Sequence, residues 1–172
     1  MYDSTPHMTF VGSALYDVAQ YPENIKDDVF TYYCTKSHVK VMNQYNISKL
    51  LLLYAVIKLS SSVDDSIVIN TLDPCFCKTG LGGESSGSAK VARAIFASLF
   101  ARTAEEGSRL IVKAASTGRE SHGGYMRAGE LQAYAPVITS AEGVQRSEHV
   151  WGALCSKLER LQPGVLANVT AV

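Results

Sequence analysis

The chain has 172 residues, of which 47% are apolar and 19% charged, and its 16 basic side chains balance 16 acidic ones. This length suffices for a single domain over residues 1–172 with a sizeable core. Without a basic surplus, nucleic-acid binding through phosphate contacts is not expected. The longest apolar run, residues 50–57, is too short for a membrane span, which takes about 20 residues.

The compartment and the metal content follow from the N-terminus and the cysteines. Residues 1–6 lack the basic start and apolar stretch of a signal peptide, so we expect a cytoplasmic protein whose cysteines are free thiols. Cys75 and Cys77 are separated by one residue, whereas zinc knuckles use two to four. The histidines are scattered, and no metal site is expected.

The first half of the chain has the pattern of a parallel strand–helix–strand unit. Residues 8–13 are short and β-prone and end in Gly-Ser, which predicts a buried strand running into a turn. Residues 34–60 follow a helical pattern, and within them residues 50–57 are apolar almost all round. Residues 66–72 are β-branched and apolar, as in a central parallel strand. We therefore expect an α/β fold.

The second half is predicted to be mostly helical. Helices are expected over residues 89–100 and 103–116, followed by a short edge strand near residues 123–126. A last helix is expected over residues 140–161, with Ser140 as its N-terminal cap. The loop of residues 73–80 follows the second strand at its carboxyl end, where ligands bind in open α/β sheets.

Tyr45 and Lys49 are spaced at i and i+4 on the predicted long helix, so their side chains are neighbours. A free tyrosine has a pKa near 10, and bringing it to about 7 takes roughly 4 kcal/mol of preferential stabilisation of the anion. A partly shielded cation one turn away can supply this. Such a phenol can exchange a proton with a carbonyl or alcohol oxygen. Spacing alone does not establish this, because Tyr and Lys recur at i and i+4 by chance.

The order of several motifs resembles the short-chain dehydrogenase/reductase family. That family has a serine after one strand, a Tyr-x-x-x-Lys helix, and a loop with a threonine after the next strand, and here these are Ser13, Tyr45, Lys49 and Thr79. The amino-acid sequences of residues 69–71, 76–79 and 101–107 are most similar to the fungal, retinol-dehydrogenase-like branch of the family. That branch often serves secondary-metabolite pathways. The resemblance implies a Rossmann-like fold and oxidoreductase activity with NADP(H) on a small-molecule carbonyl or alcohol.

The resemblance also implies roles for individual residues. Ser13 would orient the substrate oxygen, Tyr45 would transfer the proton, and Lys49 would lower the pKa of Tyr45 and hold the nicotinamide ribose. Cys77 stands where the loop backbone meets the cofactor amide, and Thr79 would contact the nicotinamide end. Tyr45, Lys49, Cys77 and Thr79 would thus bind the cofactor.

The sequence departs from the family in two ways. It contains no Gly-rich turn of the kind that receives the pyrophosphate at a helix N-terminus, nor the strands and helices around it. We therefore expect a truncated Rossmann-like fold, a parallel βαβ unit plus C-terminal helices, in which the N-terminal dinucleotide-binding half is missing. In addition, Cys75 follows Pro74 where the family has glycine, and its side chain would crowd the nicotinamide.

Three functions remain open on this basis. The first is an NADP(H)-dependent oxidoreductase, and the second is a cofactor-independent proton-transfer catalyst such as an isomerase, dehydratase or cyclase. The third is a non-catalytic partner protein derived from the family. In each case the first strand would have an open edge, a site for pairing with another chain. We expect a homodimer or a hetero-complex that supplies the missing sheet edge.

Overall fold

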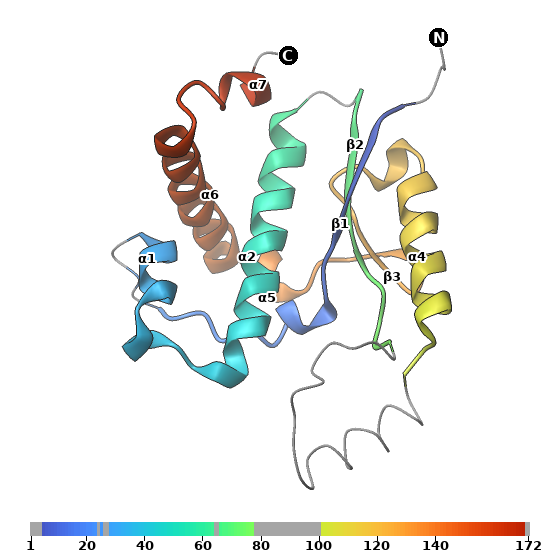
Figure 1. Ribbon diagram of the computed structural model, residues 1–172, viewed down its shortest axis with the longest axis horizontal. Coiled ribbons are helices and arrows are strands. Elements are labelled where there is room, and N and C mark those ends of the chain that lie inside the picture. The colour runs from blue at the N-terminus through green and yellow to red at the C-terminus, as the bar shows by residue number, and fades with distance from the viewer. Residues whose placement is uncertain (1–4, 24, 26–27, 64–65, 78–100, 171–172) are drawn as a thin grey trace, which may run out of the picture.

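The computed structural model describes residues 5–23, 25, 28–63, 66–77 and 101–170, and these form an α/β fold around a four-stranded sheet (Figure 1). The strands are β1 (His7–Val11), β2 (Val68–Asp73), β3 (Tyr125–Arg127) and β4 (Glu130–Gln132). The α-helices are α1 (Val29–Cys34), α2 (Val41–Ser62), α4 (Ala104–Ser116), α5 (Pro136–Thr139), α6 (Ala141–Leu161) and α7 (Ala167–Thr170). Short 3-10 turns are η1 (Ala14–Tyr16), η2 (Lys36–His38) and η3 (Arg119–Ser121).

The strands lie in the order β1-β2-β3-β4, with β1, β2 and β3 parallel and β4 antiparallel to β3. Because α2 connects β1 to β2, the predicted parallel strand–helix–strand unit is confirmed. The prediction that its first strand is buried was wrong, since no residue of β1 is buried. The strand predicted near residues 123–126 is β3, but its expected edge position was wrong. A tight turn through Ala128 and Gly129, with φ of 53° and 86°, leads into the short strand β4. This strand pairs with β3 and takes the edge position of the sheet.

The helices form layers on both faces of the sheet. Figure 1 shows α2 on one face and α4 on the other, and α6 packs on the side of α2 that faces away from the sheet. The sheet therefore has the two-sided cover of a doubly wound fold. Among the described residues, no helix combines the length and apolar character that crossing a bilayer would need.

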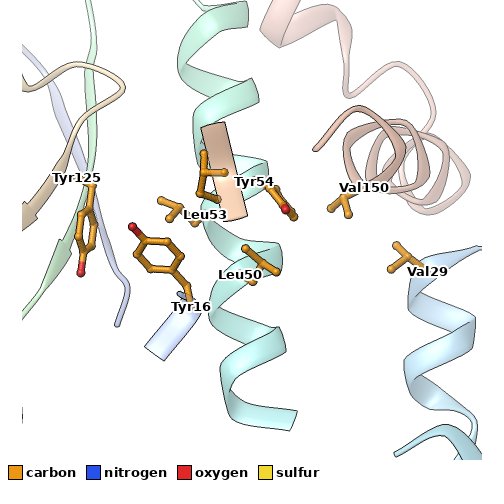
Figure 2. Packing of buried hydrophobic residues seen from close by; sticks show 8 residues of the cluster. Tyr16, Val29, Leu50, Leu53, Tyr54, Tyr125 and Val150 are labelled. Atoms are coloured by element: carbon orange, nitrogen blue, oxygen red, sulfur yellow. The ribbon is translucent and has the colours of Figure 1, made fainter. Parts of the chain in front are cut away.

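The main core lies between the sheet, α2 and α6. Leu50, Leu53 and Tyr54 on one stripe of α2 are at most 2% exposed. Figure 2 shows this stripe packing toward Tyr16 and Tyr125 on the sheet side and toward α6 and α1 on the other. The Tyr54 hydroxyl donates a hydrogen bond to Val137 O at 2.9 Å, which satisfies a polar atom inside the core. The near-continuous apolar run of residues 50–57 is thus explained by burial between two layers.

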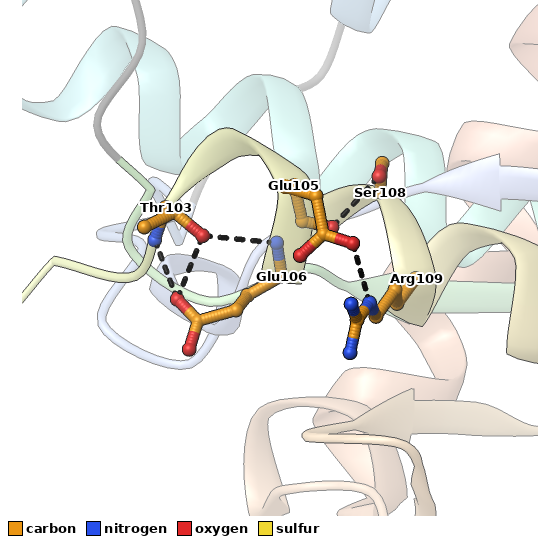
Figure 3. Close-up of polar contacts among 5 residues, drawn as sticks. All are labelled: Thr103, Glu105, Glu106, Ser108 and Arg109. Atoms are coloured by element: carbon orange, nitrogen blue, oxygen red, sulfur yellow. Dashed lines mark hydrogen bonds and ion pairs between the residues drawn. The ribbon is translucent and has the colours of Figure 1, made fainter.

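Helix α4, which lies on the face of the sheet opposite α2, begins with a capping box. The Thr103 hydroxyl accepts a hydrogen bond from the Glu106 N–H at 3.1 Å, and the Glu106 carboxylate accepts one from the Thr103 N–H at 2.7 Å (Figure 3). This reciprocal pair satisfies two N–H groups that the helix leaves free at its start. The predicted helix over residues 103–116 is confirmed, whereas the one over residues 89–100 lies outside the described residues.

The region before α2 differs from the prediction of one helix over residues 34–60. Helix α2 begins only at Val41, and α1 and η2 precede it as separate elements. Thr35 and Val39 interrupt the helical path because both adopt extended backbone angles. The predicted last helix is confirmed as α6, with the Ser140 hydroxyl accepting from the Gly143 N–H at 3.1 Å.

Candidate functional site

The carboxyl ends of β1 and β2 meet at one edge of the sheet, because the two strands are parallel (Figure 1). Just after β1, the Gly12 N–H donates to Leu72 O at 2.7 Å. A Cβ atom at Gly12 would lie only 2.8 Å from Thr71 Cγ2, so the close approach of the two strands here depends on glycine. The Gly-Ser pair therefore marks the end of β1, and Ser13 comes directly after it.

Ser13 lies at the start of the turn η1. Its hydroxyl oxygen accepts a hydrogen bond from the Leu15 N–H at 3.3 Å, as a helix cap does. The turn is anchored by Tyr16, whose buried ring meets the ring of Tyr125 edge-on with centroids 5.3 Å apart. The Tyr16 hydroxyl oxygen also accepts from the Ala135 N–H at 3.1 Å. The backbone that carries Ser13 is thus held against both the sheet and the segment before α5.

Tyr45 and Lys49 are neighbours on α2, as the spacing predicted. The Lys49 Nζ lies 5.6 Å from the centre of the Tyr45 ring, within the range of a cation–π contact. The same Nζ donates a hydrogen bond to Val11 O at 2.9 Å, which joins α2 to the end of β1. Tyr45 is 40% exposed, so its ring is open to a ligand. The catalytic roles assigned to Ser13, Tyr45 and Lys49 remain predictions.

Asn43 is a positioning residue that the sequence reasoning missed. Its side-chain oxygen accepts from the Gln20 N–H at 2.9 Å, and its side-chain nitrogen donates to Gln20 O at 2.8 Å. This clamp ties the segment that follows η1 to the first turn of α2, close to Tyr45 in the chain. No sequence motif predicts this contact, because the partner of the Asn43 side chain is the backbone of Gln20, 23 residues away.

The loop after β2 is shaped by Asp73. Its Oδ1 accepts from the Cys75 N–H at 3.0 Å, and its Oδ2 lies 3.4 Å from Arg127 Nε. Cys75 has φ of 64°, the left-handed region that glycine adopts without strain. Cysteine here therefore adopts a conformation that glycine would adopt without strain, and the hydrogen bond to Asp73 helps to hold it.

Cys77 contacts α4 rather than the Tyr45–Lys49 pair. Its thiol donates to Pro74 O at 3.3 Å, and a Cβ atom at Gly107 would lie 2.5 Å from its sulfur, so Gly107 makes room for it. Burial, with a smaller effect of the nearby Cys75, raises the pKa of the Cys77 thiol, which favours a packed, neutral group. Thr79 lies outside the described residues. In the part of the chain that is described, no three His, Cys, Asp or Glu side chains gather into a metal site.

Comparison with curated proteins finds several fungal relatives. The chain is 31% identical over 165 residues to "Short chain dehydrogenase FGM9" of Gibberella zeae, a match that covers 94% of this chain and 48% of the relative. It is 36% identical over 129 residues to "Short chain dehydrogenase/reductase dmxR8" of Cryptosporiopsis sp., covering 73% of this chain and 39% of the relative. It is 31% identical over 155 residues to "Short chain dehydrogenase/reductase mfmJ" of Annulohypoxylon moriforme, a match that covers 88% of this chain and 45% of the relative.

The matches to these relatives agree with the order of the motifs at the carboxyl ends of β1 and β2. The chain spans about half the length of the curated relatives that it matches. No family model matches the chain, and no solved structure does so either. The serine after β1, the Tyr-x-x-x-Lys helix and the loop after β2 lie in the order that the resemblance requires. The chain belongs to the short-chain dehydrogenase/reductase family and corresponds to its C-terminal half.

Proposed function

We propose that this chain is the catalytic part of an NADP(H)-dependent oxidoreductase that interconverts a carbonyl and an alcohol on a small molecule of secondary metabolism. The observation that carries the proposal is the Tyr45–Lys49 pair, with the ammonium 5.6 Å from the ring centre. The Tyr45 side chain is 40% exposed at the sheet edge where α/β folds bind ligands. A phenol that is both accessible and close to a cation is suited to proton transfer.

Ser13, Tyr45 and Lys49 would each have a separate role in the proposed reaction. In reduction, the Tyr45 hydroxyl donates its proton to the substrate's carbonyl oxygen, and in oxidation the phenolate takes the proton from the alcohol. The positive charge of Lys49 would stabilise the negative charge that develops on the Tyr45 oxygen during proton transfer. The Ser13 oxygen accepts from the Leu15 N–H, so its own hydrogen can be donated to the substrate oxygen and orient it.

Two features support binding of the nicotinamide end of the cofactor, whereas the Cys75 side chain, which is expected to crowd the nicotinamide, counts against it. The Lys49 ammonium is a suitable donor for the ribose hydroxyls, and Cys75 has a φ of 64°, which a glycine at that position would adopt without strain. When bound, NADP(H) supplies or takes up the hydride. The sequence has no Gly-rich turn for the pyrophosphate, so we expect tight binding only together with a polypeptide that provides one.

Titration with NADPH tests the proposal. We expect a saturable change of NADPH fluorescence, and carbonyl reduction that Tyr45→Phe lowers by about 10²- to 10⁴-fold. Tyr32→Phe is the matched control, because it removes a phenol hydroxyl from a ring that stacks on His38 instead. The absence of any saturable change, both for the chain alone and with the other half of a relative added, would contradict the proposal.

A second candidate function is cofactor-independent proton transfer on a carbonyl compound. It is favoured by the fact that Ser13, Tyr45 and Lys49 all belong to this chain while the pyrophosphate turn does not. An isomerase, dehydratase or cyclase would need only these residues. Turnover without any nicotinamide, abolished by Tyr45→Phe, would favour this function over the first.

A further inference from the structure

The first turn of α2 projects into solvent. Val41 and Met42 are the two most exposed large apolar side chains among the described residues, at 81% and 92%. Successive side chains point about 100° apart around a helix, so the exposure of both means that this turn extends beyond its neighbours instead of resting on them. Large apolar side chains exposed side by side indicate a surface that contacts an apolar partner.

The segment that follows η1 extends this surface. The Asn43 side chain exchanges hydrogen bonds of 2.9 and 2.8 Å with the Gln20 backbone, so the residues before Gln20 run beside the first turn of α2. Two of them, Leu15 and Val18, are 47% and 59% exposed. Figure 1 shows the start of α2 at the same end of the molecule as the end of β1. We call this set the apolar tip: Leu15, Val18, Val41 and Met42.

Positive charge accompanies the apolar tip. The chain as a whole is neutral, but residues 29–63 contain four lysines and no acidic residue. Lys36 and Lys40 directly precede the tip in the chain, are exposed, and form no ion pair with any described residue. Asp17, also exposed, is the one acidic residue of the segment from Gly12 to Gln20. The tip therefore combines apolar side chains with an excess of basic ones.

This combination matches the surface of a bilayer that contains anionic lipids. Such a surface offers negative headgroups to the lysines and an apolar region beneath them to the side chains of the tip. A second copy of the chain is a poorer match. A two-fold interface uses the same surface on both subunits, so it would bring the lysines of the two copies together, and like charges in an interface are costly.

We propose that the apolar tip docks this protein on the surface of a membrane that contains anionic phospholipids. Val18, Val41 and Met42 enter the headgroup region, and Lys36 and Lys40 contact lipid phosphates. Tyr45 follows Met42 by about one helical turn, so docking brings it close to the bilayer, and an apolar substrate dissolved in the lipid would reach it from there. This consequence rests on the proposed function, whereas docking itself does not.

Co-sedimentation with lipid vesicles tests the docking. We expect the chain to bind vesicles of an equal mixture of phosphatidylcholine and phosphatidylserine, to bind less as salt is added, and not to bind phosphatidylcholine alone. Met42→Ser should weaken binding about tenfold and Lys40→Gln about fivefold, whereas Asp17→Asn should strengthen it. Val112→Ser is the matched control, because Val112 is 67% exposed on α4 and lies outside the tip.

Three results of this experiment would overturn the docking. They are no binding to the anionic vesicles, equal binding to both kinds of vesicle, and equal weakening by Met42→Ser and Val112→Ser. Self-association of the chain without lipid that Met42→Ser abolishes would assign the tip to a second copy and overturn the choice of partner. The variants change exposed side chains, and an unchanged melting temperature confirms that they fold.

Fluorescence quenching by brominated phosphatidylcholine in the same vesicles locates the contact. The Met42→Trp variant should be quenched, whereas the native Trp151 on α6 should not. Quenching of Trp151 in the unsubstituted chain would place the membrane on another face and overturn the proposal. Quenching of Tyr45→Trp supports the approach of the site to the bilayer, and its absence contradicts it. Failure of NADPH binding by the docked protein would remove only the proposed function.

Discussion

The two parts of α2, an exposed half of residues 41–49 and a buried half of residues 50–62, differ in burial. The first turns are open, with Val41 81% and Met42 92% exposed, and Tyr45 follows at 40%. Ile47 is the one buried side chain among residues 41–49, whereas residues 50–62 include five, of which Leu50 and Tyr54 are completely buried. The helix is thus held mainly by residues 50–62, and residues 41–49 are more open to solvent.

This division explains how a reactive pair can be both rigid and accessible. The buried half fixes the helix between the sheet and α6 (Figure 2), so the helix is held in place while Tyr45 stays partly open to solvent. No side chain caps the start of α2, which begins after Lys40. The Asn43 clamp and the Lys49 bond to Val11 O instead tie this end to its surroundings.

The largest effect is expected in the buried half. Leu50→Ala removes a completely buried side chain from the main core and should lower the free energy of unfolding by about 2–5 kcal/mol. Urea denaturation followed by circular dichroism measures this. A loss below about 1 kcal/mol would show that this half does not hold the helix.

The next effect is expected from Tyr54→Phe and depends on pH. Burial raises the pKa of Tyr54 to about 12, whereas an unfolded tyrosine titrates near 10. The unfolded state therefore ionises first, and stability that is complete below pH 10 is lost as the pH rises toward 12.

Replacing Tyr54 by Phe should cost about 1 kcal/mol at pH 7, because Val137 O loses its donor. It should also reduce the alkaline loss by on the order of 2 kcal/mol. Urea denaturation between pH 7 and 11.5 would show the stability curves of the two proteins converging and then crossing, with Tyr32→Phe as control. Curves that stay parallel would contradict the burial of this hydroxyl.

The contrast within α2 could be predicted only in part. Residues 50–57 are apolar on nearly every side, as in a buried helix, and the spacing of Tyr45 and Lys49 predicted that their side chains are neighbours. The start of the helix was misplaced because Thr35 and Val39 break it by backbone angles that the side-chain pattern does not reveal. Helix α1 was missed because it is short, and only Val29 on it is buried.

At the site, local patterns were informative and long-range contacts were not. Gly12 and Ser13 marked the end of β1, since a glycine and a capping hydroxyl act on their own neighbours. The bond from Lys49 to Val11 O and the fit of Cys77 against Gly107 join segments far apart in the chain. Such contacts arise from the sheet topology, which a single sequence does not specify.

Lys49→Met tests the exposed half where it touches the sheet. The change keeps the length of the side chain but removes the hydrogen bond to Val11 O and the charge beside Tyr45. We expect a loss of about 1 kcal/mol in the free energy of unfolding, since the site is partly open to solvent. Turnover should fall much further than stability. Equal loss of both would indicate a structural role for the ammonium.

The smallest effect is expected for Met42→Ala in the first turn of α2. Met42 is 92% exposed, so truncation removes little contact, and alanine has the higher helix propensity. The free energy of unfolding should change by no more than about 0.5 kcal/mol in urea denaturation, with Leu50→Ala as the contrasting variant. A larger loss that grows with protein concentration would mean that another chain covers this turn. Tyr45, one turn further along, would then be reached by its ligand through an interface rather than from open solvent.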